Sequence, residues 1–433
     1  MASATNSGGL KFRLTILNFL EFAIWGAYLT CMSRYLITAG LGDYISYFYS
    51  VQGFVSLFMP ALMGIVADRW IQAQKTLSLC QFIAGITMCA VAFYGNNAGA
   101  NADFSILFSL YTLSVAFYMP TIALTNSVAY AALEGVGEDT VKAFPPIRVW
   151  GTIGFIISML CVDWTGLQDK PWQFAVSGGL SIIMAFYALT MPACPTNQGG
   201  EKKSLVDALG LRAFTLFKQK KMAIFFIFSM LLGSALQITN GYANPFIASF
   251  GAKEAFANTF GVQHANTLIS LSQISETLCI LLIPFFLKRF GIKIVMLMSM
   301  FAWVLRFGFF AIGDPGFPGV ILLILSMIVY GVAFDFFNIS GSLFVDQETD
   351  LNIRSSAQGL FMMMTNGFGA SIGMLLAGEV VNHFTHGEVV NGEFYTVGDS
   401  LGGWSTCWYI FAGYALVVAI LFAILFQYKH KRV

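Results

Sequence analysis

The sequence predicts an all-α membrane protein with twelve transmembrane helices in two six-helix halves. Of its 433 residues, 57% are hydrophobic and only 10% are charged, and the mean hydropathy is +0.73. A soluble chain of this length could not bury so much apolar surface. Apolar windows long enough to cross a bilayer recur along the chain, and one polar stretch near the middle divides them into two sets.

Each predicted span is a window of about 20 mostly apolar residues, the length needed to cross the hydrocarbon core. The first has no small-residue cleavage site behind a short apolar run, so we expect it to be retained and not removed as a signal peptide. The predicted spans are residues 12–34, 44–66, 74–95, 104–133, 146–167, 173–193, 222–249, 264–288, 292–312, 318–343, 355–381 and 404–428.

The polar stretch defines the domain organisation. We expect an N-terminal six-helix half at residues 1–193, a basic cytoplasmic linker at 194–221 and a C-terminal six-helix half at 222–433. The two halves resemble each other: Pro60 and Pro284 occupy similar positions near the end of the second span of each half. Val115-Ala116-Phe117 and Val332-Ala333-Phe334 begin similar runs in the fourth spans. The offsets, 224 and 217 residues, are nearly equal, as duplicated halves require.

Charge placement predicts the orientation. Of the 23 Lys and Arg residues, Arg34, Lys170 and Lys253 fall on one side, Arg148 and Arg306 lie within spans, and the other 18 fall on the side of both termini. Because basic loops stay inside, we expect both termini in the cytoplasm. The net charge of +1 gives no indication of a nucleic-acid partner. The expected surroundings are membrane lipid.

Two carboxylates lie where a lipid-soluble sequence should have none, Glu276 in the eighth span and Asp335 in the tenth. A charge at helix centre costs roughly 2.5 to 3.5 kcal/mol on insertion scales, so such residues mostly face a polar cavity and have a function. The chain is therefore predicted to be a transporter.

Amide side chains accompany these acids at helical spacing. Gln273 lies three positions before Glu276 and shares its helix face, and Gln237 and Asn240 repeat this spacing in the seventh span. The two pairs suggest one shared site. Alternatively, such amides only join neighbouring helices by hydrogen bonds.

The tenth span carries a stripe that suits a flat ligand with polar edges. Tyr330 and Phe334 are four positions apart, Asp335 lies one step round the helix, and Asn338 follows a turn later. Either aromatic ring alone would be ordinary packing in a chain with 43 Phe.

The fifth span supplies a counter-charge. After two consecutive prolines, Arg148, Thr152 and Phe155 follow at spacings that put them on one helix face. If the helix begins before the prolines, Arg148 lies about two turns inside and needs a carboxylate partner, for which Asp335 and Glu276 are candidates. Thr152 alone could equally be a helix-joining residue.

Two further acidic residues, Asp68 and Glu21, are weaker indications of function. Asp68 and Arg69, after the second span, form a candidate gating pair that can hold the inside closed, although a merely solvated loop carboxylate is the alternative. Glu21 in the first span is either a third protonatable group or a side chain that snorkels to the cytoplasmic surface.

Enzyme chemistry finds no support. The sequence has no phosphate-binding loop, no nucleophile elbow and no H-E-x-x-H motif. We therefore expect no enzymatic activity, no metal and no cofactor, with the proton as the coupling ion.

Five runs resemble the nucleoside:H⁺ symporter family, the nucleoside permeases of bacterial inner membranes within the major facilitator superfamily. They are AFPPIRVWGTIGFI, KMAIFFIFSMLLGSALQITN, SLSQISETLCILLIPFFL, SMIVYGVAFDFFNISGS and AQGLFMMMTNGFG. The resemblance implies a monomeric, proton-coupled importer of purine nucleosides, pyrimidine nucleosides or both, with the ligand in a central cavity. The implied ligand contacts are Arg148, Thr152, Phe155, Gln237, Asn240, Gln273, Glu276, Tyr330, Phe334 and Asp335.

In this scheme Asp335 and Glu276 divide proton coupling and ligand binding, with Arg148 as their shared partner. The sequence departs from the family at Glu21, where an uncharged glutamine is expected, and in a longer outer loop at 382–404. The main alternative is a proton-coupled importer of a sugar or oligosaccharide on the same scaffold.

Overall fold

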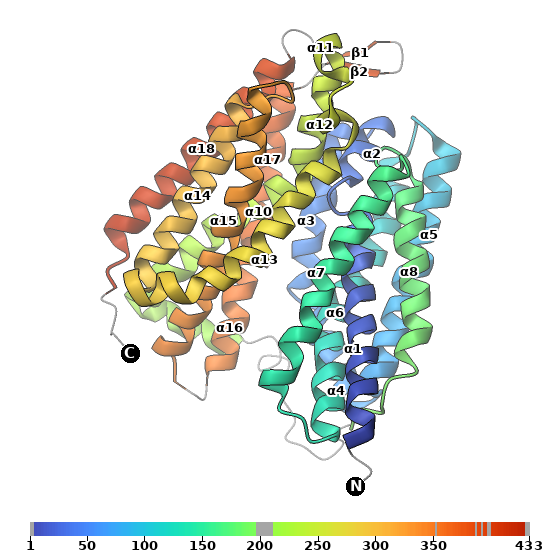
Figure 1. Cartoon of the computed structure of the whole chain (residues 1–433), viewed down its shortest axis with the longest axis vertical. Coiled ribbons are helices and arrows are strands. Elements are labelled where there is room, and N and C mark those ends of the chain that lie inside the picture. The colour runs from blue at the N-terminus through green and yellow to red at the C-terminus, as the bar shows by residue number, and fades with distance from the viewer. Residues whose placement is uncertain are drawn as a thin grey trace. The chain divides into compact units, whose positions relative to one another are not determined.

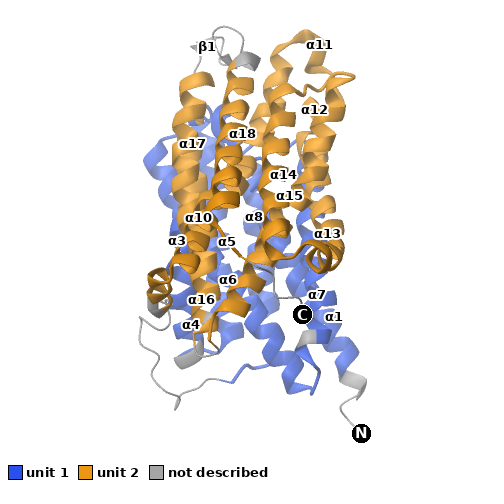
Figure 2. Cartoon of the chain, turned by 90° about the vertical axis from the view of Figure 1, so that its left-hand side faces the viewer, with its two compact units in different colours: residues 1–41, 54–208 blue, residues 42–53, 209–433 orange. Residues whose placement is uncertain are grey.

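The computed structural model describes residues 4–195, 211–350, 353–385, 388–390, 393–395 and 400–428, and these residues are almost entirely helical (Figure 1). They form two compact units, coloured separately in Figure 2. Unit 1 comprises residues 1–41 and 54–208, and unit 2 comprises residues 42–53 and 209–433. Residues 196–210 of the predicted linker lie outside the described part of the chain.

The helices of unit 1 are α1 (Ala4–Gly26), α2 (Met32–Thr38), α4 (Met59–Arg69), α5 (Ala73–Ala98), α6 (Phe104–Gly135), α7 (Thr140–Trp164) and α8 (Trp172–Ala188). Helix α3 (Ile45–Ser56) begins in unit 2 and ends in unit 1. At the start of α6 the Asp103 carboxylate accepts a hydrogen bond from the backbone N–H of Ile106, at 3.1 Å, which caps the helix.

Unit 2 contains the short helices η1 (Gly42–Tyr44), η2 (Leu211–Lys218), η3 (Phe250–Ala252), α11 (Glu254–Ala257) and α12 (Phe260–Gln263). Its longer elements are α10 (Lys220–Ser249), α13 (Ala265–Phe290), α14 (Ile292–Ile312), α15 (Gly319–Glu348), α16 (Arg354–Met362), the π-helical segment η4 (Met363–Gly369), α17 (Ala370–Thr385) and α18 (Ser400–Leu425). Gly291, at φ 78°, makes the sharp turn between α13 and α14.

Ten of the described helical segments are long and apolar enough to cross a membrane, and α8 is apolar but shorter. The first predicted span was wrong in its bounds. The chain is helical from Ala4 to Gly26, turns, and resumes at Met32, because apolar character alone does not mark where a helix ends.

Two small features also differ from expectation. Strands β1 (Glu388–Val390) and β2 (Glu393–Tyr395) form an antiparallel pair within the predicted outer loop. The segment 42–53, assigned by sequence to the N-terminal half, packs in unit 2. There Ser50 Oγ donates to the Ser371 carbonyl and Ser371 Oγ donates to the Ser50 carbonyl, both at 2.9 Å.

The two units have the same internal packing pattern. In unit 1, α5 packs against α6 and α8, α4 against α6, and α1 against α7. In unit 2 the corresponding contacts join α14 to α15 and α18, α13 to α15, and α10 to η4 and α17. The internal repeat seen in the sequence therefore has a counterpart in how the helices pack.

Glycines allow the closest of these contacts. A Cβ at Gly154 of α7 would collide with the backbone carbonyl of Phe19 in α1, and one at Gly369 of η4 with that of Met230 in α10. These two glycines therefore let their helices pack closely against α1 and α10.

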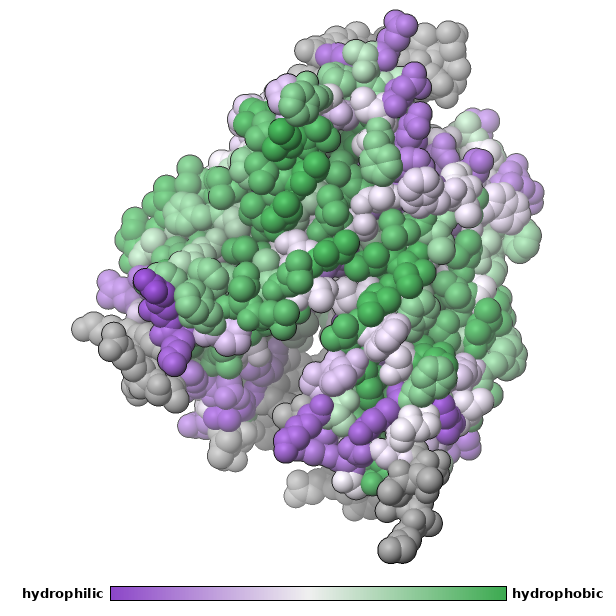
Figure 3. Space-filling view, in the orientation of Figure 1, coloured by the Kyte–Doolittle hydropathy of each residue, from purple (hydrophilic) through white to green (hydrophobic). Residues whose placement is uncertain are grey.

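The outer faces of the helices are apolar. Figure 3 shows hydrophobic side chains over the visible faces of α13, α14 and α18, with hydrophilic side chains near the end of α13. Leu281, Phe285 and Leu305 are among the large side chains exposed there. Such faces suit contact with lipid.

Candidate functional site

Helices α13 and α15 bring the two intramembrane carboxylates of the sequence together. Asp335 is 5% exposed and Glu276 is half-buried, and the two lie close enough for their charges to interact. Like charges repel strongly in a low-dielectric region, and a proton on either group removes the repulsion. Asp335 Oδ2 has no hydrogen-bond partner among the described residues. The pair therefore has the electrostatics of a proton-binding site.

The aromatic stripe of α15 forms a stacked pair beside these acids. The rings of Tyr330 and Phe334 are 5.9 Å apart and nearly parallel, with an interplanar angle of 6°. The Tyr330 hydroxyl lies within reach of the Gln273 amide, and its ring is close to the charges of Glu276 and Asp335. The side chains predicted on α13 and on α15 thus meet around Tyr330.

A buried arginine packs against the Tyr330 ring of this aromatic pair. Arg306 of α14 is 1% exposed, and its Cζ lies 4.6 Å from the centroid of the Tyr330 ring. Its Nη1 donates to the Ser326 carbonyl at 2.7 Å and to Ser272 Oγ at 3.3 Å. The guanidinium fixes the ring by a cation–π contact and ties α13, α14 and α15 together.

The predicted amide pair of α10 is hydrogen-bonded internally. Asn240 Nδ2 donates to Gln237 Oε1 at 3.1 Å, and Gln237 Nε2 donates to the Tyr49 carbonyl at 3.2 Å. These contacts orient both amides, and part of their hydrogen-bonding capacity is used to join α10 and α3. Asn240 is half-buried and Gln237 is 8% exposed.

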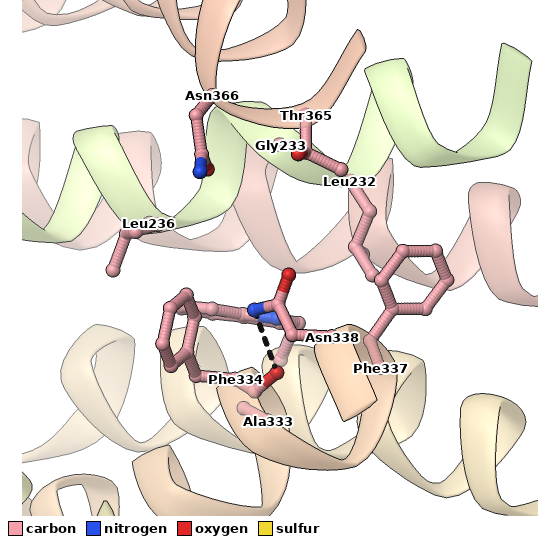
Figure 4. Close-up of a pocket in the computed structure, with 10 residues that line it drawn as sticks. Leu232, Gly233, Leu236, Ala333, Phe334, Phe337, Asn338, Thr365 and Asn366 are labelled. Atoms are coloured by element: carbon pink, nitrogen blue, oxygen red, sulfur yellow. Dashed lines mark hydrogen bonds between the residues drawn. The ribbon is translucent and has the colours of Figure 1, made fainter. Parts of the chain in front are cut away.

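A small pocket in unit 2 lies against the same aromatic stripe (Figure 4). Its volume of about 20 Å³ is room for roughly one water, so it is too small for a large ligand. Asn338 Nδ2 donates to the Phe334 carbonyl at 3.1 Å, and Figure 4 shows Asn366 pointing from its helix toward the same space. The lining residues are Leu232, Gly233, Leu236, Trp303, Ala333, Phe334, Phe337, Asn338, Thr365 and Asn366.

Sequence reasoning missed Trp303 and Asn366 of this lining. Trp303 stands edge-on to Tyr330, with centroids 6.0 Å apart and an angle of 90°. Asn366 belongs to the π-helical segment η4, a local irregularity often found at functional sites. The available signal was the polar Thr365-Asn366 dipeptide within an apolar span.

The three residues predicted on the fifth span all lie on α7 of unit 1. The helix begins at Thr140, before the prolines, so Arg148 lies about two turns inside. Its Cζ lies 3.8 Å from the centroid of the Phe22 ring. Phe155 is 7% exposed and stands edge-on to Trp25, with centroids 6.4 Å apart, and Thr152 is half-buried.

Glu21 does not snorkel to the surface, so that alternative is wrong. Its side chain is 0% exposed and accepts hydrogen bonds from Gln81, Thr121 and Thr125. It also interacts electrostatically with Arg148. Glu276 and Asp335, which the sequence suggests as partners of Arg148, belong to the other unit. Their role as its counter-charge stays a prediction.

The predicted gating pair lies at a helix end. Asp68 and Arg69 are the last two residues of α4, and their side chains lie outside what the structure describes. Within the described ranges, no three His, Cys, Asp or Glu side chains are grouped so as to hold a metal ion.

The fold matches those of solved structures with little sequence similarity to this chain. Solved structures of a peptide transporter and a xylose transporter superpose with TM-scores of 0.68 and 0.63 at 12% and 13% identity, each covering 96% or more of both chains. The chain thus has the major facilitator fold of these two proteins.

Closer relatives define the family. The family model described as nucleoside H⁺ symporter matches residues 8–431, so the chain belongs to the nucleoside H⁺ symporter family. The chain is 47% identical to the xanthosine permease of Escherichia coli and to its nucleoside permease NupG, over 97% or more of this chain and 97% of each relative. The solved structure of NupG superposes with a TM-score of 0.87, at 47% identity, covering 97% of this chain and all of that one.

Proposed function

We propose that this protein imports purine or pyrimidine nucleosides by proton symport across the bacterial inner membrane, through alternating access. The observation that carries the proposal is the Glu276 and Asp335 pair lying beside the stacked rings of Tyr330 and Phe334. A proton-binding pair and a flat aromatic surface are what coupling and a nucleobase require. The family and the relatives support the same substrate class.

The ligand contacts are assigned by chemistry. Amides and carboxylates bind ribose hydroxyls and base edges, and aromatic rings stack on the base. Nucleosides carry no phosphate, so the site needs no cluster of basic side chains. The proposed contacts are Arg148, Thr152 and Phe155 in unit 1, and Gln237, Asn240, Gln273, Glu276, Tyr330, Phe334 and Asp335 in unit 2.

The remaining parts of the proposal rest on charge placement and on the family resemblance. The basic side chains near both termini support a cytoplasmic location for them. The proton is the coupling ion and no other cofactor takes part. The protein works as a monomer, and Asp68 and Arg69 gate the cytoplasmic side.

The experiment is uptake by purified protein in proteoliposomes. Labelled uridine should accumulate when the outside is more acidic and should only equilibrate without a gradient. Unlabelled adenosine should compete, whereas sugars should not. Inhibition by sugars and not by nucleosides would favour a sugar importer, the second candidate. Failure of any solute to accumulate under the gradient would contradict symport altogether.

A further inference from the structure

Glu21 of α1 sits in a fully buried polar network that the proposed nucleoside site does not use. Gln81 Nε2 of α5 donates to its Oε2 at 3.0 Å. From α6, Thr121 Oγ1 lies 2.6 Å from its Oε1, and Thr125 Oγ1 donates to Oε2 at 3.0 Å. Three donors around one carboxyl suit its ionised form. A charge is therefore accommodated here without contact with water.

The same network also accommodates the protonated form. Thr121 Oγ1 lies 2.6 Å from Glu21 Oε1 and equally 2.6 Å from the Tyr118 carbonyl. A hydroxyl has one hydrogen, so it cannot donate to both acceptors. When Thr121 donates to Tyr118, the short contact with Glu21 requires the hydrogen to belong to the carboxyl. Uptake of one proton by the carboxyl, together with one rotation of the Thr121 hydroxyl, thus converts the ionised form into the protonated form.

The other hydrogen bonds of the network are compatible with both protonation states. The two amide hydrogens of Gln81 point at Glu21 Oε2 and at Thr121 Oγ1, at 3.0 and 3.1 Å. Ser181 Oγ of α8 lies 2.5 Å from Gln81 Oε1, which fixes the orientation of the amide. Thr121 accepts one of those hydrogens and keeps a second lone pair for a protonated Glu21.

The charge of Glu21 is felt by groups on the helices around it. Arg148 on α7 interacts with it electrostatically, as do the Tyr118 phenol on α6 and the Cys80 thiol on α5. The Tyr118 hydroxyl also donates to the Glu21 backbone carbonyl at 2.6 Å. Arg148 is the cation of this set. It interacts with α1 twice, electrostatically with Glu21 and through the Phe22 ring.

We propose that Glu21 is a proton-binding site within unit 1, and that its charge controls how firmly Arg148 is held. A proton from solvent forms the O–H bond at Oε1, the Thr121 hydrogen turns to the Tyr118 carbonyl, and the attraction on Arg148 falls. Arg148 then becomes more available to a ligand. This last step rests on the proposed function, because Arg148 is a proposed nucleoside contact.

The first test needs no nucleoside. Full-length protein is titrated with acid while infrared difference spectra record protonated carboxyl bands. The wild type should gain a band that Glu21→Gln lacks. Identical pH-dependent spectra of the wild type and this variant would show that Glu21 does not change protonation, and would overturn the proposal.

A hydroxyl variant keeps the test usable if Glu21→Gln fails to fold. Thr125→Val removes a donor to the ionised carboxyl, so the midpoint of the Glu21 band should move up by about one pH unit. Thr87→Val is the matched control, because its hydroxyl donates to the Ile83 carbonyl on its own helix at 2.7 Å. Equal midpoints in the two variants would contradict the assignment.

The link to Arg148 is tested by uridine binding as a function of pH. The wild type should show a step in affinity of at least about fivefold at the Glu21 midpoint, and Glu21→Gln should lose it. An unchanged pH profile in the variant would overturn the link. If the wild type binds no uridine at any pH, the proposed function fails while the infrared result still decides whether Glu21 binds a proton.

Discussion

The guanidinium of Arg148 lies over the ring of Phe22, with Cζ 3.8 Å from the ring centroid. Phe22 follows the buried Glu21 in α1, so two neighbouring residues interact with one arginine of α7, the first through its charge and the second through its ring. The proposed cationic contact is therefore preorganised by α1, a helix without any proposed ligand contact of its own.

Replacing Phe22 with Leu should weaken uridine binding. A cation–π contact contributes about 0.5 to 2 kcal/mol, so the dissociation constant should rise roughly 2- to 30-fold. Equilibrium binding to purified protein measures it. Phe12→Leu, at a side chain of α1 that is 65% exposed, is the control and should bind like the wild type. Equal affinities in both variants would show that the contact between Phe22 and Arg148 does not contribute to uridine binding.

Asp335→Asn should separate transport from coupling. The amide cannot give up a proton as the acid does, so a pH gradient should no longer concentrate uridine, while exchange of labelled for unlabelled uridine continues. Uptake and counterflow in the same proteoliposomes measure the two activities. Glu276→Gln, tested in parallel, shows which acid moves the proton. Gradient-driven accumulation by Asp335→Asn would rule out Asp335 as that group.

Phe334→Ala should lower nucleoside affinity by removing a stacking surface. Base–aromatic stacking contributes about 1 to 3 kcal/mol, which corresponds to roughly 5- to 150-fold in the dissociation constant. Competition for labelled uridine by adenosine measures the change. Phe301→Ala is the control, since Phe301 is 44% exposed on the outer face of α14. A ligand that binds Phe334→Ala unchanged does not stack there.

An ion pair outside the membrane spans should make stability depend on pH. Lys11 Nζ lies 2.8 Å from Glu138 Oε1, and this contact, with a hydrogen bond from Ser7, lowers the pKa of Glu138. Because the pKa is lower in the folded state, the stabilisation is complete above the ordinary carboxyl value of about 4.3 and is lost as pH falls through the folded value.

Glu138→Gln should accordingly unfold at a slightly lower temperature than the wild type near neutral pH, and the difference should vanish in acid. Thermal unfolding in detergent at several pH values measures this. Glu134→Gln, at an exposed side chain near the end of α6, should show no such dependence. A constant difference at every pH would mean that the ion pair contributes nothing.

Much of the fold was predictable because lipid imposes a simple rule: a segment that crosses the membrane must be a long run of mostly apolar residues. Spans predicted at 264–288 and 292–312 appear as Ala265–Phe290 and Ile292–Ile312, with Gly291 as the break. The rule does not determine where a helix ends or what structure a loop adopts. The end of α1 at Gly26 and the β1–β2 pair are examples.

The candidate site was predictable where its residues share a helix. Tyr330 stacks on Phe334, and Asn240 donates to Gln237, as their spacings require. Contacts between helices were not readable in this way. The cation–π contact of Arg306 with Tyr330 joins residues 24 positions apart, and no periodicity connects them.

The sequence by itself determined that this chain crosses a membrane many times, that it is built from two similar halves, and that charged side chains lie inside it. These conclusions rest on composition and spacing, because every backbone polar group in lipid must be satisfied within a helix and every charge there is costly. Only the tertiary structure decided what surrounds each charge. Glu21 was ambiguous in the sequence and became a buried carboxyl with three donors, because its partners Gln81, Thr121 and Thr125 come from helices 60 to 104 residues away.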